Sequence, residues 1–84
     1  MEQKEILKLI GARIKEVRMQ KGLSQVDLVG KMEGNIDPTN ISRIEAGRTN
    51  ITVSTLHRLA TALEVSMSEL LEISSQVNPR RAPQ

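Results

Sequence analysis

Apolar residues recur every three or four positions over the first twenty residues of the chain, which is the spacing of an amphipathic helix. The apolar residues at this spacing are Ile6, Leu7, Ile10, Ile14 and Val17. We expect this helix to run from about Lys4 to Gln20 and to end at Gly22, because glycine readily adopts the left-handed conformation that follows a helix. No segment gives the signal of a strand, so the pattern predicts an all-α chain.

Two shorter helices follow, and each begins with a cap. Ser24, with Asp27 three residues on, resembles a capping box and predicts a helix through about Lys31. Asp37-Pro38 begins the third helix, because aspartate accepts hydrogen bonds from free amides and proline fits the first helical position. Gly47 should end that helix. The candidate buried positions of the two helices are Val26, Leu28, Val29, Met32, Ile41 and Ile44.

Two further helices are expected before the pattern stops. Thr52 caps a fourth helix, and Ser66 with Glu69 forms a capping box for a short fifth one. The apolar positions of the fourth helix are Val53, Leu56, Leu59, Ala60 and Leu63. From Ser74 the chain carries two prolines and little to bury. We therefore expect one domain over residues 1–73 and a mobile tail over residues 74–84.

Composition narrows the range of functions. The 84 residues include no cysteine and one histidine, and no catalytic motif is visible, so we expect no enzyme activity, no cofactor and no metal. No apolar run approaches the roughly 20 residues that span a bilayer, so we expect no membrane association and a cytoplasmic protein. The chain contains no aromatic residue, and binders of RNA or single-stranded DNA usually stack bases on aromatic rings. A net charge of +2 permits a nucleic-acid partner, which we expect to be duplex DNA.

The third helix carries the candidate chemistry. If Ile41 and Ile44 face the core, four polar residues remain for solvent or a partner: Thr39, Asn40, Ser42 and Arg43. Asparagine pairs bidentately with adenine, arginine pairs with guanine, and the threonine methyl group contacts the thymine methyl group. These residues are the candidates for contacts to bases in the major groove.

Phosphate contacts are expected from the ends of the helix pair. Gln25 lies at the start of the second helix, where an amide side chain and free backbone amides can hold a phosphate. Arg48, Thr49 and Asn50 follow the third helix and are placed to contact the backbone at its far end.

These residues resemble the helix-turn-helix domains of phage repressors and Cro (the xenobiotic-response-element family). The similarity runs from about Ile10 to Leu71. Its motifs are Arg18, then Lys21-Gly22-Leu23-Ser24-Gln25, then Ile41-Ser42-Arg43-Ile44-Glu45-Ala46-Gly47-Arg48, then Leu56 to Val65, and Ser66-Met67-Ser68-Glu69-Leu70-Leu71. The resemblance implies a five-helix, lambda-repressor-like domain that binds operator DNA as a two-fold dimer.

The resemblance also implies roles for individual residues. By position, Gln25 matches a phosphate-binding glutamine, and Arg48 matches a residue that contacts the backbone. Thr39, Asn40 and Arg43 match positions that contact bases. Arg18 and Glu45 match a structural ion pair between the first and third helices.

The chain departs from the family pattern at three points. Val29 stands where the family usually has alanine, at the crossing of the second and third helices, which suggests a slightly wider crossing. The link from Met32 to Asp37 is longer than in the shortest members. Pro38 replaces what is often a polar residue that contacts bases.

The sequence therefore predicts a sequence-specific transcriptional regulator, a repressor or autoregulator, whose third helix enters the major groove of an operator. We expect two copies to pair through exposed apolar residues of the last two helices and their flanks, namely Ile51, Met67, Leu71 and Ile73. The alternative is an antitoxin or a restriction-modification controller-type regulator that acts with a protein partner. An adjacent toxin gene, or an adjacent methylase and nuclease pair, would favour this alternative.

Overall fold

The computed structural model describes residues 2–32, 34 and 36–73, and this part of the chain forms five helices and no strand. The helices are α1 (Gln3–Gln20), α2 (Gln25–Lys31), α3 (Pro38–Glu45), α4 (Val53–Leu63) and α5 (Met67–Leu70). The all-α prediction is confirmed, and each predicted helix is present. The predicted mobile tail, residues 74–84, lies outside the described residues.

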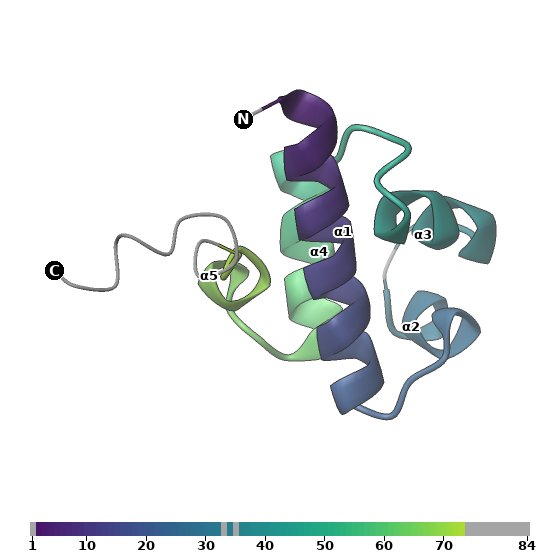
Figure 1. The fold of residues 1–84 in the computed structure, drawn as a ribbon. Helices are drawn as coiled ribbons and strands as arrows, with labels where there is room; N and C mark the ends of the chain where they lie inside the picture. The colour runs from purple at the N-terminus through teal and green to yellow at the C-terminus, as the bar shows by residue number, and fades with distance from the viewer. Residues whose placement is uncertain (1, 33, 35, 74–84) are drawn as a thin grey trace, which may run out of the picture.

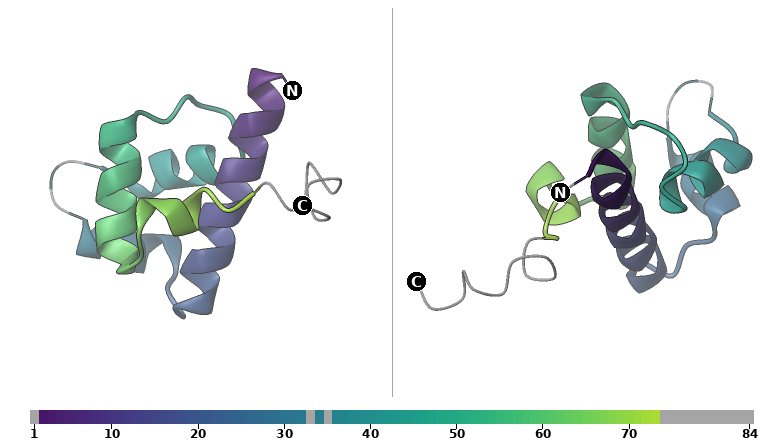
Figure 2. Two further views of the ribbon diagram at one scale, coloured as in Figure 1. Left: turned by 90° about the vertical axis from the view of Figure 1, so that its left-hand side faces the viewer. Right: turned by 45° about the horizontal axis from the view of Figure 1, so that its top comes forward.

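The helices α1 and α4 form the centre of the domain, and the other three helices pack on two sides of them (Figures 1 and 2). The short helices α2 and α3 lie on one side, and α5 lies on the opposite side, where it contacts both α1 and α4 (Figures 1 and 2). Further contacts join α1 to α3, α2 to α3 and α2 to α4. The helix pair α2 and α3 is therefore held from behind by the two longest helices, and its outer side is left uncovered.

The core lies where the five helices meet. Its largest fully buried side chains are Ile14, Leu28, Ile41, Leu59, Leu63 and Leu70. Each helix contributes at least one of them, so every helix, including the four-residue α5, is anchored by apolar burial. Ile41 and Ile44 are both buried, as the spacing on α3 predicted.

The predicted caps are present. The side chains of Ser24, Asp37, Thr52 and Ser66 each accept a hydrogen bond from a backbone N–H in the first turn of the helix that follows. These bonds satisfy amides that have no partner within the helix. The boundaries of the short helices thus follow from local chemistry, which explains why the sequence predicted them closely.

Two valines differ from expectation. Val26 was a candidate buried position, but 64% of it is exposed, because it lies two residues, about 200° around the helix, from buried Leu28. Val53, the first residue of α4, is 74% exposed and extends beyond the core. The apolar face of α2 is consequently narrower than predicted.

Gly11 sets how closely α1 and α3 approach. A Cβ atom built there would lie 2.6 Å from the carbonyl oxygen of Glu45 and would also overlap the carbonyl oxygen of Ile44. The backbone of α1 therefore packs directly against the C-terminal end of α3. None of the helices in the described residues is long and apolar enough to cross a bilayer.

Candidate nucleic-acid interface

The outward face of α3 is polar and free of internal contacts. Thr39, Asn40, Ser42 and Arg43 are exposed, whereas Ile41, Ile44 and Glu45 of the same helix are buried. Within the described part of the chain, the four exposed side chains form no hydrogen bond or ion pair. Their polar groups are thus available to a partner without first breaking a bond within the protein.

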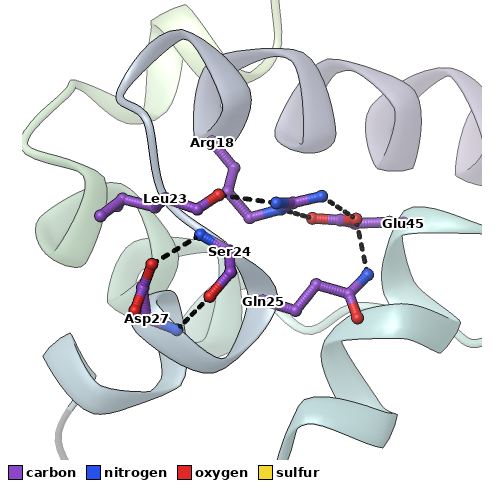
Figure 3. Close-up of polar contacts among 6 residues, drawn as sticks. All are labelled: Arg18, Leu23, Ser24, Gln25, Asp27 and Glu45. Carbon is purple, nitrogen blue, oxygen red and sulfur yellow. Dashed lines mark hydrogen bonds and ion pairs between the residues drawn. The ribbon is translucent and has the colours of Figure 1, made fainter.

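Behind this face, a buried ion pair joins α1 to α3 (Figure 3). The guanidinium of Arg18 donates to both carboxylate oxygens of Glu45, from Nε at 2.7 Å and from Nη2 at 3.1 Å. Its remaining nitrogen, Nη1, donates to the carbonyl oxygen of Leu23 at 2.7 Å. Arg18 and Glu45 are each only 8% exposed, so the pair is shielded from water. Bidentate geometry and the third bond together compensate the burial of both charges.

Gln25 belongs to the same network. It is the first residue of α2 and is half-buried, and its Nε2 donates to Oε1 of Glu45 at 3.0 Å (Figure 3). This bond uses the amide N–H₂ group, while the side-chain carbonyl oxygen accepts no hydrogen bond in the described residues. Glu45 thereby fixes the start of α2 relative to the end of α3.

The capping box beside Gln25 holds the negative charge of Asp27 at the start of α2. Asp27 accepts a hydrogen bond from the backbone N–H of Ser24 at 2.9 Å, and the Ser24 hydroxyl oxygen accepts one from the Asp27 N–H at 2.9 Å (Figure 3). The backbone N–H of Ser24, followed by its hydroxyl, holds the pKa of the Asp27 carboxyl below its ordinary value. Asp27 is therefore ionised at neutral pH.

The residues after α3 form a fixed turn. Arg48 and Asn50 are exposed, and Thr49 is half-buried. The backbone N–H of Arg48 donates to the carbonyl oxygen of Arg43 at 2.9 Å, which ties the turn to α3. Asn50 Oδ1 accepts a hydrogen bond from Gln3 Nε2 at 2.6 Å, which ties the turn to α1. The turn therefore presents Arg48 directly beyond the C-terminal end of α3.

The apolar residues that we expected at a dimer interface are less exposed than anticipated. Leu71 is 42% exposed, but Ile51 and Met67 are half-buried and pack against the core, and Ile73 is also half-buried. The expectation of four exposed side chains is therefore wrong for three of them, because the core extends further toward the ends of α4 and α5 than the pattern suggested.

Sequence reasoning missed the role of Arg13. Its Nε donates to the carbonyl oxygen of Glu69 at 2.8 Å, and its guanidinium lies 3.0 Å from Glu16 and 3.7 Å from Glu72. These contacts attach α5 to α1. The pair with Glu16, three residues on, was visible in the sequence, but the contacts with α5 depend on the tertiary fold. No group of three or more metal-binding side chains occurs in residues 2–32, 34 and 36–73.

Two short helices joined by a turn, packed against longer helices on one side and polar on the outer face of α3, form the arrangement of a helix-turn-helix domain. Residues 14–70 match the family model described as helix-turn-helix (HTH_3), and the chain belongs to this family. The match begins near the middle of α1 and ends with α5, so it spans the whole core.

Named relatives carry the same domain. The chain is 37% identical over 67 residues to an uncharacterized HTH-type transcriptional regulator of Sinorhizobium fredii, a match that covers 80% of this chain and 84% of the relative. It is similar to the restriction-modification controller protein C.AhdI from Aeromonas hydrophila, with 34% identity, coverage of 76% and 94% of the two chains, and a TM-score of 0.70.

It is also similar to a mutant of the restriction-modification controller protein C.Esp1396I, with 38% identity, coverage of 79% and 89%, and a TM-score of 0.69. Together with the family match, these similarities identify the chain as a DNA-binding transcriptional regulator.

Proposed function

We propose that the chain is a sequence-specific repressor or autoregulator that binds duplex operator DNA with α3 in the major groove. The observation that supports this most strongly is the division of α3 into a buried face and an exposed polar face whose side chains have no partner within the described residues. In this proposal the residues that contact base edges are Thr39, Asn40, Ser42 and Arg43. Asn40 and Arg43 supply the bidentate contacts that discriminate between bases.

Phosphate contacts fix the position of α3 in the groove. Gln25 at the start of α2 contacts one phosphate, and Arg48, Thr49 and Asn50 contact the backbone beyond α3. Gln25 is held by Glu45 of α3, so the groups that contact phosphate and the groups that contact bases move as one body. A fixed spacing between the two sets keeps base contacts in register.

We propose further that the protein acts as a homodimer. A single small module buries only about 600–1,000 Å² on DNA, which gives limited affinity. Two copies that contact half-sites about one helical turn apart would share one operator. We also propose a cytoplasmic location and no catalytic activity, since the family and the named relatives are transcriptional regulators.

Control of a restriction-modification system is the second candidate. Two similar proteins of known structure are named as restriction-modification controller proteins, and the matches cover most of both chains. In this case, too, α3 would lie in the major groove of an operator. That operator would lie beside a methylase and nuclease gene pair. Binding of a protein partner, as expected of an antitoxin, remains the alternative that the gene neighbourhood distinguishes.

Selection of bound sequences from a random duplex pool tests the proposed function. We expect a two-fold symmetric site whose half-sites are about 10 base pairs apart, centre to centre. The Asn40→Ala and Arg43→Ala variants should relax the preference at one base position each, at about 1–3 kcal/mol per contact. Gln25→Ala and Arg48→Ala should weaken binding about equally on all sequences.

Gln20→Ala, on the exposed end of α1, provides a matched control and should leave both sequence preference and affinity unchanged. Recovery of no enriched sequence, or an unaltered preference in the Asn40 and Arg43 variants, would contradict the proposed function.

A further inference from the structure

A groove of about 750 Å³ lies between the first turns of α1 and the turn that follows α3. It is lined on the α1 side by Lys4 and Lys8, and on the other side by Arg48 and Asn50. None of the residues that line it is acidic. The groove therefore gathers three positive charges from α1 and from the turn after α3, which are separated in the sequence by α2 and α3.

The three basic side chains that line the groove face solvent. Lys4, Lys8 and Arg48 are exposed, and none of them takes part in an ion pair within the described part of the chain. Glu5, between the two lysines on α1, forms no ion pair with either of them, and its carboxylate accepts a hydrogen bond from the backbone N–H of Glu2 at 3.2 Å. A cluster of uncompensated cations raises the local concentration of anions.

The groove is preformed. A Cβ atom at Gly47 would lie 2.7 Å from Cα of Lys8, so only glycine lets the turn approach α1 this closely. The hydrogen bond of 2.6 Å from Gln3 to Asn50 closes one end. Because both walls are fixed to each other, the backbone positions that carry the two lysines and Arg48 are set before any ligand binds.

The groove begins at the C-terminal end of α3, because Ala46, Gly47 and Arg48 line it. With eight residues, α3 is about 12 Å long, which is close to the width of the major groove. If α3 crosses the major groove, its two ends approach the phosphate backbones on either side. On the protein, Arg48 lies next to the C-terminal end of α3, and the groove that it lines also carries Lys4 and Lys8.

We propose that this basic groove binds backbone phosphates of the duplex outside the base pairs that α3 contacts, with Lys4 and Lys8 as additional phosphate-binding residues. The inference rests on the proposed function, because it requires α3 to lie in the major groove. It lengthens the footprint of each protomer and makes affinity depend on flanking DNA of any sequence.

The test compares the Lys4→Gln/Lys8→Gln double variant with the wild-type protein on two duplexes. One is the site selected from the random pool with several flanking base pairs, and the other is the same site trimmed at its ends. On the extended duplex, the slope of log affinity against log salt is negative, and each lost contact should make it shallower by about 0.9. Affinity at 0.1 M salt should fall about eightfold per lysine. On the trimmed duplex, wild type and variant should bind alike.

Lys31→Gln provides the matched control. This substitution also removes one exposed positive charge. The Lys31 side chain lines a different cavity, with Met32 and Arg58, away from the turn after α3. Glutamine and lysine have similar helix propensities, so all variants should stay folded, as thermal melting can verify. If the double variant and Lys31→Gln reduce the steepness of the salt dependence by the same amount per charge removed, only the net charge of the protein matters and the proposal is wrong.

The same experiment separates this inference from the proposed function. Wild-type protein that selects no duplex contradicts the proposed function itself. Wild-type protein that binds the selected site with a slope unchanged by the double variant contradicts the groove alone. An equal loss on the extended and trimmed duplexes also overturns the proposal, because it places the lysine contacts inside the base-contact region.

Discussion

At the scale of single residues, Glu45 connects three helices behind the candidate interface. Its carboxylate accepts hydrogen bonds from Arg18 of α1 and from Gln25 of α2, while its backbone belongs to α3. Three helices thus meet at one buried carboxylate. Removal of Glu45 leaves the charge of Arg18 without its ionic partner in a shielded site, which is more costly than loss of an exposed pair.

We expect Glu45→Ala to lower the free energy of unfolding by about 3–5 kcal/mol. Denaturant unfolding followed by circular dichroism measures this change. Glu16→Ala is the matched control, because it breaks an ion pair with Arg13 in which Glu16 is 52% exposed, and exposed pairs contribute about 1 kcal/mol or less. Similar losses in the two variants would contradict the role given to burial.

Asp27 should make stability depend on acid pH. Hydrogen bonds from Ser24 lower the pKa of Asp27 in the folded state, so the folded protein favours the ionised carboxylate. The stabilisation is complete above the unfolded pKa of about 3.9 and is lost as the pH falls through the lower folded pKa. We expect wild type to melt at a higher temperature than Asp27→Ala at pH 7, and this difference to shrink below about pH 4. A difference that stays constant into strong acid would contradict the assignment.

The residue scale also shows what sequence could and could not predict. The caps at Ser24 and Asp37 involve neighbours within three residues, so their chemistry is visible in the sequence alone. The bond from Gln25 to Glu45 joins residues 20 apart, and the proximity of Lys8 to Gly47 depends on how α1 crosses α3. Such contacts are set by packing, which no local pattern encodes.

At the scale of helices, the crossing of α1 and α3 sets the position of α3. Periodicity predicted that each helix exists and which face is buried, as for Ile41 and Ile44, because burial follows the helical repeat. It failed at Val26, because a seven-residue helix buries only a narrow face. The crossing itself depends on Gly11, whose lack of a side chain lets the two backbones touch.

Gly11→Ala tests this close approach. Alanine raises helix propensity by about 1 kcal/mol, yet here its methyl group would overlap backbone carbonyl oxygens of α3. We expect a net loss of stability and weaker DNA binding, because α3 must move. Thermal melting and binding to the selected duplex measure the two effects.

Gly30→Ala is the opposite case and serves as the control. Gly30 lies within α2, and a Cβ atom there would have no neighbour within 4 Å. We expect this variant to gain roughly 0.5–1 kcal/mol and to bind DNA as wild type does. If both glycine variants are stabilised, the crossing of α1 and α3 is looser than the contact at Gly11 requires.

At the scale of the whole molecule, the two sides of the domain differ in character. The helix pair α2 and α3 occupies one side, and α5 occupies the opposite side (Figure 1). Leu71 directly follows α5. A contact between two copies through α5 would leave α3 of each copy uncovered. Arg13 supports this arrangement, because its bonds to Glu69 and Glu72 hold α5 against α1.

Leu71→Glu tests the proposed dimer. Leu71 is 42% exposed at the end of α5, so a charge there is tolerated in a monomer but unfavourable in an apolar contact between two copies. We expect wild type to sediment as a dimer at tens of micromolar, and the variant to sediment as a monomer with an unchanged melting temperature. Affinity for the two-fold site should fall steeply, because each protomer would then bind its half-site alone.

Met19→Glu is the control for this variant, because Met19 is 61% exposed but belongs to α1 and not to α5 or its end. It should neither dissociate the dimer nor weaken binding to the two-fold site. A wild-type protein that sediments as a monomer both free and on DNA would contradict the dimer. If Leu71→Glu stays dimeric while Met19→Glu dissociates, the copies pair through α1, and the interface belongs to the face around Met19.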